Sequence, residues 1–587
     1  MTADQDLLRP THRSAGSPPG TALMVDDTEL DGPLFDAFAA VAARQPAHLA
    51  LDDGTERLSY GELHDRALAL GARIAAVVPQ DGLVGVLVPT TVLYPLAWLA
   101  CLAARRPFLP LDPNQPPARL QAILAEAGLA AAIIPTPTSD LAASLPADLP
   151  RLSIAAELGH EPAPLPPDLP SSPGLPSSQV GMVLFTSGST GRPKGIALHE
   201  RSQRLRAMNY RMACDLGSDD RLLSLHPPWT NGGAGDTLGA LLCGASLHLL
   251  DLKRAGLAGV RAMLSDGITV CATVPVVTRT LMATDGAAEA LRGVRILRLG
   301  GETVMGSDIT GLARMLPPTA RILVRFGLTE AGTTLAQRLI NPHAPVESGP
   351  LALDPAVPGQ TISVVDADGN SAAPGQPGEL VIRGRYVALG HWVAGKLDAS
   401  AFSADPAAPG IRVVRSGDMV RLRPDGMLVP IGRADRQVKI NGIRVEPEET
   451  EAALRSLPTV ADAAVFVHGT ADEHVLVAFV VPAPGTHTFG TQAFGPHASG
   501  RQASGRHAAQ HTAVLVRDWR TALAARLPPQ QVPARIQVVP AIPLLPSLKP
   551  DLPALRALLP AQGSPGMLVR AWTWLRDIRR RSSAPHR

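Results

Sequence analysis

The sequence predicts an α/β fold in which strands alternate with helices and pair mostly in parallel. Two continuous apolar runs of strand length, at 83–88 and 108–111, flank a segment of helical length at 94–104. Three later apolar runs of strand length end in small or polar residues, namely 270–274, 296–301 and 322–326. Parallel sheets bind ligands where their strands end, so we expect a site there. The length of 587 residues predicts two to four domains.

The composition excludes several classes of protein. Apolar residues make up 45% of the chain, and 54 Lys and Arg against 52 Asp and Glu leave a net charge of +2. This small charge and an aromatic content of 3% argue against a nucleic-acid-binding surface. The four cysteines are dispersed without a Cys-x-x-Cys pair, so neither a disulfide framework nor a zinc site is expected.

The amino-terminal segment and the apolar runs predict a soluble, cytoplasmic protein. Residues 1–28 are polar, contain Pro and Gly, and lack the apolar core of a secretory signal, so we expect a disordered leader. The longest apolar run, Leu96–Ala104, is far shorter than the roughly 20 residues that span a bilayer.

The first elements of the fold follow from apolar spacing. Helical spacing begins at Leu34, and LSYGEL at 58–63 predicts a strand and then a helix that ends near Val77. Residues 135–178 are rich in Pro, Ser and Ala and predict an irregular connection. A helix is expected over 199–214.

Residues 185–195, FTSGSTGRPKG, form a polar loop between two apolar runs and point to nucleotide binding. Glycines let backbone amides turn toward one anion, hydroxyl groups add donors and a lysine adds positive charge, which together predict a cradle for the phosphates of ATP. A Walker loop is excluded because Lys194 lies between Pro193 and Gly195. Considered alone, the loop is also compatible with a Gly/Ser-rich surface turn. The candidate phosphate-binding residues are Thr186, Ser187, Gly188, Ser189, Thr190, Gly191 and Lys194.

The chain resembles the acyl-adenylating enzyme superfamily, most of all a stand-alone adenylation domain of non-ribosomal peptide synthetases. The resemblance extends over about residues 34–556. It is carried by FTSGSTGRPKG, by GGE at 300–302, by RFGLTE at 325–330, by SGD at 416–418 and by GRADRQVKINGIR at 432–444. It implies a large amino-terminal domain of stacked mixed sheets with covering helices, and a small mobile α+β carboxyl-terminal domain. The implied ranges are 29–434 and 435–560, with a low-complexity insertion at 484–512 and a basic tail at 561–587.

The resemblance also implies a nucleotide site. In the family the aromatic residue of RFGLTE packs on adenine, the threonine meets phosphate and the glutamate binds Mg²⁺; the matching residues are Phe326, Thr329 and Glu330. The other matches are the adenine-side residues Gly300, Gly301 and Glu302, the ribose-binding Asp418, the ATP-contacting Arg433 and the hinge residue Asp435. Taken alone, these segments are also ordinary turn, helix-start or hairpin sequences.

Lys549 matches the family lysine that reaches from the small domain to the substrate carboxylate and the α-phosphate. One ammonium group there neutralises charge that develops on both. The sequence departs from the family pattern, because Ser547 and Leu548 replace the usual Asn-Gly and Pro550 follows the lysine. A surface lysine without catalytic function is the alternative.

The acid pocket is predicted from the segment LLCGASL at 241–247. Asn231 and the two glycines after it are expected in a loop that precedes a buried helix. Aligned with peptide synthetases, the segment places Asn231 where amino-acid-activating domains carry an aspartate that pairs with the α-ammonium. A neutral Asn prefers a hydroxyl or carbonyl group, and aryl-acid-activating members resemble this chain in having Asn. Further pocket residues in the same alignment are Gly232, Ala272 and Gly300, with Arg298 and Arg325 nearby. The acid is then an amino, hydroxy or aryl acid, with one without a free α-ammonium favoured, although the two arginines are also compatible with a structural role.

The acyl group is expected to pass to the phosphopantetheine thiol of a carrier protein supplied in trans. Coenzyme A is the alternative acceptor, and a nucleotide-binding protein without ligase activity is the alternative from another class. No binding of nucleic acid and no stable membrane insertion is expected.

Two segments outside the resemblance have simpler interpretations. The insertion at 484–512 contains His487, His497, His507 and His511 without fixed spacing, which predicts a solvated loop rather than a metal site. The end of the tail, 567–587, predicts a basic amphipathic helix that packs on its own domain, with contact to a membrane surface or a partner protein as the alternative.

Overall fold

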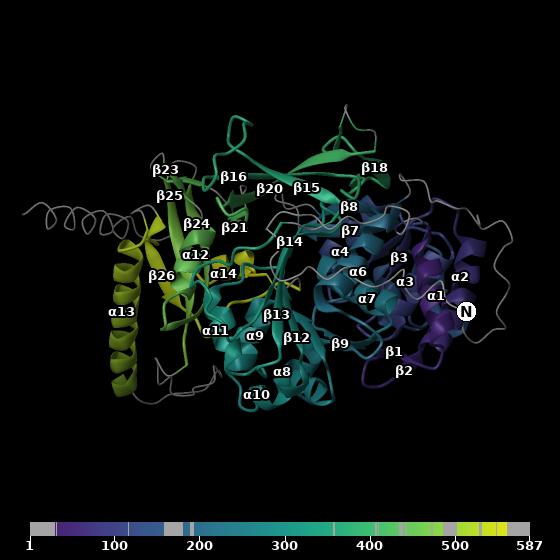
Figure 1. The fold of residues 1–587 in the computed structure, drawn as a ribbon, viewed down its shortest axis with the longest axis horizontal. Helices are drawn as coiled ribbons and strands as arrows, with labels where there is room; N and C mark the ends of the chain where they lie inside the picture. The colour runs from purple at the N-terminus through teal and green to yellow at the C-terminus, as the bar shows by residue number, and fades with distance from the viewer. Residues whose placement is uncertain are drawn as a thin grey trace, which may run out of the picture. The chain divides into compact units, whose positions relative to one another are not determined.

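The protein, described by a computed structural model, has two compact units, Met1–Asp435 and Arg436–Arg587 (Figure 1). The structure describes residues 30, 32–115, 117–157, 180–187, 193–355, 358–405, 408, 410–433, 438–440, 443–445, 447–470, 473–484, 502–527, 531–546 and 549–559. The predicted leader at 1–28 and the tail at 561–587 lie outside the described residues.

One eight-stranded sheet of the large unit has the order β14-β13-β12-β11-β9-β10-β1-β2. Its six inner strands are parallel, and the edge strands β14 and β2 are antiparallel to their neighbours. The strands are β1 (Leu49–Asp52), β2 (Arg57–Ser59), β9 (Arg221–Ser224), β10 (Ser246–Leu249), β11 (Val270–Thr273), β12 (Ile296–Gly300), β13 (Arg321–Gly327) and β14 (Thr334–Ile340). All side chains of β11 and β12 are buried, as expected for parallel strands that are covered on both faces.

The helices that connect these strands include α6 and α7, which carry side chains of the site. They are α6 (Glu200–Cys214), α7 (Asn231–Cys243), α8 (Leu252–Ser265), α9 (Pro275–Met282), α10 (Ala287–Ala290), the 3₁₀ helix η3 (Leu291–Gly293) and α11 (Gly306–Ala313). Figure 1 shows α8 to α11 beside β12 and β13.

The second eight-stranded sheet has the order β18-β17-β8-β7-β4-β3-β5-β6. Its strands are β3 (Val84–Val86), β4 (Phe108–Pro110), β5 (Ala131–Ile134), β6 (Arg151–Ser153), β7 (Val180–Ser187), β8 (Pro193–His199), β17 (Gly390–Val393) and β18 (Lys396–Asp398). The accompanying helices are α1 (Leu34–Arg44), α2 (Tyr60–Val77), α3 (Leu93–Ala103), α4 (Pro117–Ala127), η2 (Asp140–Ser144) and α5 (Ile154–Glu157). Helix α4 places Leu120 and Ile123 in a core that also contains Leu109 and Trp392 of the sheet.

A third, smaller sheet completes the large unit. Its order is β15-β16-β20-β19, and β21 pairs with β20. The strands are antiparallel and comprise β15 (Gln360–Val365), β16 (Pro377–Gly384), β19 (Ser403–Ala404), β20 (Arg412–Leu422) and β21 (Leu428–Arg433).

The small unit is an α+β structure around a three-stranded sheet. Its elements are β22 (Val438–Ile440), β23 (Ile443–Val445), α12 (Pro447–Arg455), β24 (Val460–Thr470), β25 (Glu473–Pro482), α13 (Gln502–Ala524), β26 (Arg535–Val538) and α14 (Leu552–Ala557). Successive residues of β24 face opposite sides of the sheet and belong to different cores. Val465 packs with Trp519 of α13, whereas Phe466 packs with Leu555 of α14. Helices therefore cover both faces of this sheet.

The predicted fold class is confirmed, since the large unit contains mixed sheets with covering helices and the small unit is α+β. Three local predictions were wrong. Asn231 was expected in a loop and is the first residue of α7, because the Thr230 side chain accepts from Gly233 N at 3.1 Å and caps the helix. The supposedly irregular 135–178 contains η2, β6 and α5.

The third wrong prediction is the solvated loop at 484–512, because α13 begins inside it at Gln502. Leu515, Trp519 and Leu523 recur at helical spacing and are buried, so they anchor the helix. Alanine and other good helix formers upstream favour its extension toward the amino terminus. Residues 485–501 lie outside the described part of the chain, with His487 and His497 among them.

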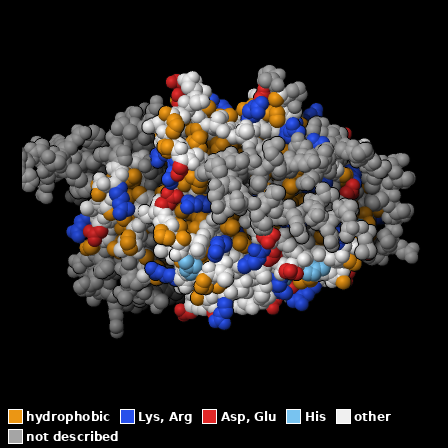
Figure 2. Space-filling model, viewed as in Figure 1, with side chains coloured by type: hydrophobic (Ala, Val, Ile, Leu, Met, Phe, Trp, Pro, Cys, Tyr) orange, Lys and Arg blue, Asp and Glu red, His pale blue; other side chains and the backbone are white. Residues whose placement is uncertain are grey.

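The described surface has no strong charge of one sign on the face in view. Figure 2 shows Lys and Arg side chains interspersed with Asp and Glu side chains there. No helix among the described residues is both long and apolar enough to cross a membrane.

Candidate active site

Four residues predicted to lie in or near the acid pocket come together at the carboxyl ends of β11, β12 and β13. Ala272 is the strand partner of Arg298, and Gly300 is the strand partner of Arg325. A Cβ atom on Gly300 would lie 2.9 Å from the Arg325 carbonyl oxygen, so the close approach of the two strands requires glycine. These residues lie at the level where parallel sheets bind ligands.

The end of β13 and the turn after it carry the three side chains of RFGLTE that were predicted to contact nucleotide. Phe326 and Glu330 are half-buried, and Thr329 is buried. The backbone of the turn is fixed, because Gly332 N donates to Thr329 O at 3.0 Å and Ala388 N donates to Glu330 O at 2.9 Å. A phenyl ring, a hydroxyl and a carboxylate therefore follow one another on a supported turn.

The segment after β12 has the geometry that its glycines allow. Gly301 has φ +83°, in the left-handed region that favours glycine, and it is exposed. Glu302, the next residue, is half-buried. The chain thus leaves the sheet in a sharp turn beside the turn that follows β13.

Asp418 lies on a bulge of β20. The register between β16 and β20 shifts across this segment, and Gly417 has φ +70°. Asp418 N donates to Ser416 Oγ at 3.0 Å, and Ser416 Oγ donates to Leu380 O at 2.8 Å, so the bulge is held by local hydrogen bonds. Arg433 is the strand partner of Asp418 on β21, which places the two predicted residues at one level of this sheet.

The glycine-rich loop is approached by an antiparallel pair of strands. Thr186 on β7 is the partner of Lys194 on β8, and Ser187 is the partner of Pro193. Gly188, Ser189, Thr190 and Gly191 lie outside the described residues, as do the side chains of Thr186, Ser187, Lys194 and Arg433. A Cβ atom at Gly195 would lie 2.8 Å from Trp392 Cβ, so this last glycine is needed for packing of β8 against β17.

A buried carboxylate, Asp236 of α7, joins side chains that the sequence did not connect. Its Oδ2 accepts from Ser224 Oγ at 2.8 Å and lies 2.7 Å from His226 Nδ1. Its Oδ1 accepts from Tyr210 OH at 3.3 Å and from Arg298 Nη1. Burial alone would raise the pKa of Asp236, but Arg298 and His226 hold this pKa well below its ordinary value.

Arg206 of α6 is bound by the start of α7. Its Nη1 donates to Asn231 Oδ1 at 2.7 Å, and its Nη2 donates to Asn231 O. A Cβ atom on Gly235 would lie 2.4 Å from Arg206 Nε, and one on Gly232 would lie 2.9 Å from His226 Cδ2. The small residues of this helix turn therefore make room for a guanidinium and an imidazole.

The aromatic ring of Tyr210 lies between two of the arginines. It is 5.2 Å from Arg298 Cζ and 5.0 Å from Arg325 Cζ, within the range of cation–π contacts. Burial and the neighbouring guanidinium groups lower the pKa of Arg206 to about 9 and that of Arg325 to about 10. Burial has the same tendency at Arg298, but the Asp236 carboxylate outweighs it and raises the pKa of Arg298.

Arg206, Tyr210 and Asp236 were missed in the sequence, although each left a signal. Arg206 and Tyr210 are four residues apart and so share one face of α6. Asp236 is the one charged residue of α7, NGGAGDTLGALLC. A carboxylate alone in an apolar helix needs a buried partner of opposite charge.

Lys549 is exposed in the small unit. Leu545 N donates to Lys549 O at 2.8 Å, and Leu544 and Pro550 form an isolated bridge, so the lysine lies in a tight chain reversal. Proline supports this reversal because its ring fixes φ. The predicted hinge residue Asp435 lies outside the described residues.

The described residues fit a magnesium ion that is carried by a nucleotide rather than held in a protein cage. Among them, no group of three or more His, Cys, Asp and Glu side chains has the arrangement to hold a metal ion. Mg²⁺ in nucleotide sites is bound by one or two carboxylates together with phosphates and water. Glu330 is a carboxylate of this kind at the ligand-binding end of the sheet.

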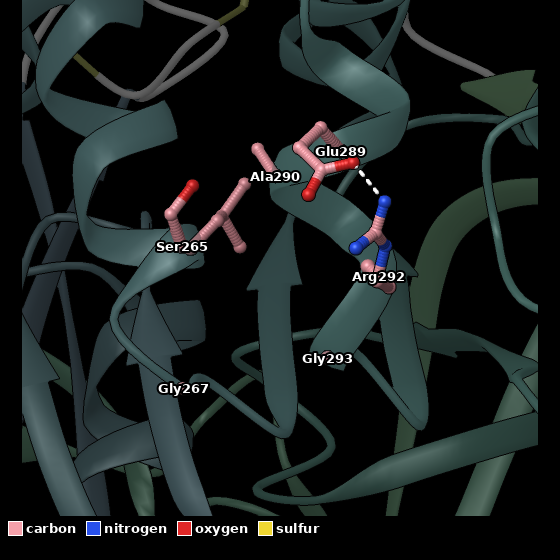
Figure 3. A pocket seen from close by; sticks show the side chains of 7 residues that line it. Ser265, Gly267, Glu289, Ala290, Arg292 and Gly293 are labelled. Carbon is pink, nitrogen blue, oxygen red and sulfur yellow. Dashed lines mark hydrogen bonds and ion pairs between the residues drawn. The ribbon is translucent and has the colours of Figure 1, made fainter.

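A surface hollow elsewhere does not coincide with the candidate site. It has a volume of about 400 Å³ and is lined by Leu264, Ser265, Gly267, Glu289, Ala290, Arg292 and Gly293. Figure 3 shows Arg292 paired with Glu289 at its edge. Gly267 and Gly293 precede β11 and β12, so the hollow lies at the amino ends of the strands, opposite to the predicted residues.

Two family models match the chain. Residues 38–392 match the family described as AMP-binding enzyme, and residues 449–549 match the AMP-binding enzyme C-terminal domain. The first match alone covers more than half of the chain. The chain belongs to the AMP-binding enzyme family.

Individual relatives differ in how much of them the chain covers. Chondramide synthase cmdD of Chondromyces crocatus is 33% identical over 79% of this chain but only 12% of its own length. Novobiocin biosynthesis protein H of Streptomyces niveus is 32% identical over 77% of this chain and 75% of its own. The benzoate CoA ligase from Burkholderia xenovorans LB400 has a similar fold, with a TM-score of 0.73 and 20% identity over 89% of this chain and 100% of that one.

Proposed function

We propose that this member of the AMP-binding enzyme family uses MgATP to activate a carboxylic acid as an acyl adenylate, with release of pyrophosphate. The observation that carries the proposal is the end of β13 with the turn after it, where Phe326, Thr329 and Glu330 bring a ring, a hydroxyl and a carboxylate to the ligand-binding edge. Such a turn offers a stacking surface for adenine, a donor for phosphate and a ligand for magnesium.

In the first step, a carboxylate oxygen of the acid attacks the α-phosphorus of ATP. The new oxygen–phosphorus bond forms as the bond to the bridging oxygen breaks, and pyrophosphate leaves with that oxygen. Donors aimed at the developing charge lower the barrier. We assign this role to the loop residues Thr186, Ser187, Gly188, Ser189, Thr190, Gly191 and Lys194, and to Thr329. Magnesium, when bound through Glu330, would neutralise charge on the phosphates.

The nucleoside is assigned to the turns that surround this position. Gly300, Gly301 and Glu302 lie on the adenine side with Phe326. Asp418 offers two acceptor oxygens to the ribose diol, and Arg433, its partner across β20 and β21, is the arginine that we assign to ATP.

Lys549 is assigned as the residue that bridges the acid and the α-phosphate, with Asp435 as the hinge of the small unit. A mobile ammonium group neutralises charge on both reactants at once. Its turn in the small unit differs from the Asn-Gly-Lys pattern of the family, so its contribution is a separate prediction.

In the second step, the acyl group moves to the phosphopantetheine thiol of a carrier protein. The thiolate sulfur attacks the acyl carbonyl carbon, and AMP leaves with the carboxylate oxygen that it had bound. We place this reaction in the cytoplasm. Coenzyme A is the alternative acceptor, and supply of either thiol in a product assay separates the two.

The test is acid-dependent pyrophosphate release from ATP, measured over a panel of amino, hydroxy, aryl and dicarboxylic acids. Release that depends on one acid class, with an acyl-AMP product seen by mass spectrometry, is the expected result. Binding of ATP without release for any acid in the panel would contradict the proposal and favour a nucleotide-binding protein without ligase activity.

A further inference from the structure

We propose that the acid that this site activates carries a second anionic group, such as a second carboxylate, which is bound by Arg206, Arg298 and Arg325. We call these three residues the arginine cluster. The inference rests on the function proposed above, because it names the class of acid that occupies the same pocket.

The first argument is charge. The side chains of the arginine cluster carry three positive charges, each with a relative exposure of 6%, and among the described residues the one buried carboxylate that contacts them is Asp236. Three positive charges against one negative leave two positive charges in a buried network. His226 contacts the same carboxylate and supplies no negative charge.

The other ionisable neighbours do not supply the missing negative charge. Burial raises the pKa of Tyr210 well above its ordinary value and that of Cys214 to about 11, so both are neutral at pH 7. A buried charge without a counterion is costly, and buried charges in proteins are normally paired. The cluster therefore has the excess of positive charge that is expected of an anion-binding site.

The second argument is hydrogen bonding. Arg325 Nε and Nη1 and Arg298 Nε are buried without a hydrogen-bond partner among the described residues. Buried donors of this kind nearly always have a partner, whether protein, water or ligand. Guanidinium groups bind carboxylates through paired N–H donors, and such charge-assisted bonds are the strong ones.

The third argument is the orientation of Asn231. An arginine can only donate, so the Asn231 atom that faces Arg206 must be the amide oxygen. The NH₂ group of Asn231 is then the part that remains for a ligand, and it can only donate. Asn231 thus offers a ligand a donor where an α-ammonium group would require an acceptor.

The position of the cluster connects it to the candidate site. Arg298 precedes Gly300 on β12, and Arg325 is the strand partner of Gly300 on β13. The residues just beyond these strand positions, Gly301 and Gly327, are exposed. An acid whose reacting carboxylate faces the nucleotide can therefore place its other end near the guanidinium groups.

The experiment compares acids that differ by one anionic group, with wild-type protein and acid-dependent pyrophosphate release as the readout. The pairs are butyrate with glutarate, benzoate with isophthalate, and benzoate with 3-sulfobenzoate. We expect kcat/KM to be at least about tenfold higher for the dianionic member of a pair. Glutamate, which adds an α-ammonium to glutarate, is expected to be a poorer substrate than glutarate.

A variant then tests the cluster itself. Arg325→Met keeps most of the side-chain length and removes the charge, and we expect it to lower kcat/KM for the dianionic acid about 10²-fold and that for the monoanionic partner far less, so that the preference for the dianionic acid is lost. The matched control is Arg321→Met at the amino end of the same strand, where the guanidinium contacts main-chain carbonyls. Arg325→Lys keeps the charge but lacks the paired N–H donors of the guanidinium group. It replaces the Met variant if that variant does not fold, and we expect an intermediate loss of kcat/KM for the dianionic acid.

The outcomes separate this inference from the proposed function. If monoanionic or amino acids are used at least as well as dianionic acids in every pair, the arginine cluster is structural and the inference is wrong, whereas the proposed function stands. If no acid supports pyrophosphate release, the proposed function is contradicted. In that case, a rise in Tm with glutarate but not butyrate, lost in Arg325→Met or Arg325→Lys, would still support an anion site, and no rise would overturn it.

Discussion

The nucleotide side and the acid side of the candidate site hold their polar groups in opposite ways. On the nucleotide side, Glu330 lies on a turn and Asp418 on a bulge, each supported by nearby backbone or by a residue two positions away. On the acid side, Asp236 and the arginine cluster belong to helices and strands that are distant in sequence. Arg206 and Asn231 are 25 positions apart, and Arg298 and Asp236 are 62 apart.

This difference predicts which side of the site tolerates substitution of its polar residues without loss of the fold. Glu330 is half-buried on its turn and can be exchanged at less cost in stability, because water can replace its ligand. A buried ion network cannot, because the partner that remains is left uncompensated in a medium of low dielectric constant. Mutations on the two sides should therefore separate into effects on nucleotide kinetics and effects on stability.

The largest effect is expected from Asp236→Asn, which tests this separation directly. The change keeps the shape of the side chain but removes the counterion of Arg298, and three buried guanidinium groups then face one another. We expect the free energy of unfolding to fall by about 3–5 kcal/mol, measured by urea denaturation. The matched control, Asp219→Asn, alters an exposed carboxylate just before β9 and should change stability by less than about 0.5 kcal/mol. Equal stability of the two variants would remove the contrast between the two sides.

The same contrast explains what the sequence could and could not predict. Phe326, Thr329 and Glu330 were placed correctly at the end of a strand, because apolar strand runs and the turns that follow them are local patterns. The parallel order of the strands brought Gly300 beside this turn. The fold class was accessible for the same reason, since alternating strands and helices admit few arrangements.

The arginine cluster was only partly accessible. Arg298 and Arg325 were noted near the pocket, but their shared partner Tyr210 depends on how α6 packs against the sheet, and the contact of Arg206 with Asn231 depends on how α6 packs against α7. No periodicity within one element encodes that packing. The start of α7 was also misassigned because its glycines resemble a loop, whereas Gly232 and Gly235 make room for the side chains of His226 and Arg206.

The second prediction concerns a residue of the other unit, and it sharpens the contrast because its effect should be kinetic only. Lys549 is exposed, so Lys549→Ala should leave the free energy of unfolding unchanged. We expect adenylate formation to fall on the order of 10²-fold or more, with ATP binding nearly intact, because the ammonium neutralises charge in the transition state. Single-turnover pyrophosphate release and equilibrium ATP binding measure the two quantities. Lys396→Ala, on the exposed strand β18, is the control; full activity of Lys549→Ala would refute the assignment.

The third prediction concerns His199. This residue is the last of β8, the strand that follows the nucleotide loop, and its side chain caps α6, a helix of the acid side. Its Nδ1 accepts from Ser202 N at 3.1 Å, which requires a neutral ring. Burial, together with Arg412 and Arg201, lowers the pKa of His199 to about 4 from the model-peptide value of 6.5. The unfolded chain therefore binds a proton that the folded chain does not, and stability is lost as the pH falls from about 6.5 to about 4.

The variant His199→Asn keeps a capping acceptor and removes this titration. We expect its unfolding free energy to depend less steeply on pH, with a difference in slope that amounts to on the order of 2–3 kcal/mol across that range. Urea denaturation at several pH values provides the measurement, and His343→Asn, an exposed histidine, is the control. Parallel pH profiles of the unfolding free energy for wild type and His199→Asn would show that protonation of His199 does not cause the loss of stability at low pH.

The smallest effect is expected from Asp418→Asn, the counterpart of the Asp236 variant on the nucleotide side. Asn keeps one acceptor oxygen and loses the charge, so the ribose hydroxyls retain a weaker partner. We expect KM for ATP to rise about tenfold, kcat to change little, and the unfolding free energy to fall by less than for Asp236→Asn, because the Ser416 hydroxyl holds the backbone of the bulge. Asp425→Asn on the next turn is the control. A loss of stability as large as that of Asp236→Asn would show that both sides of the site are held by buried charge.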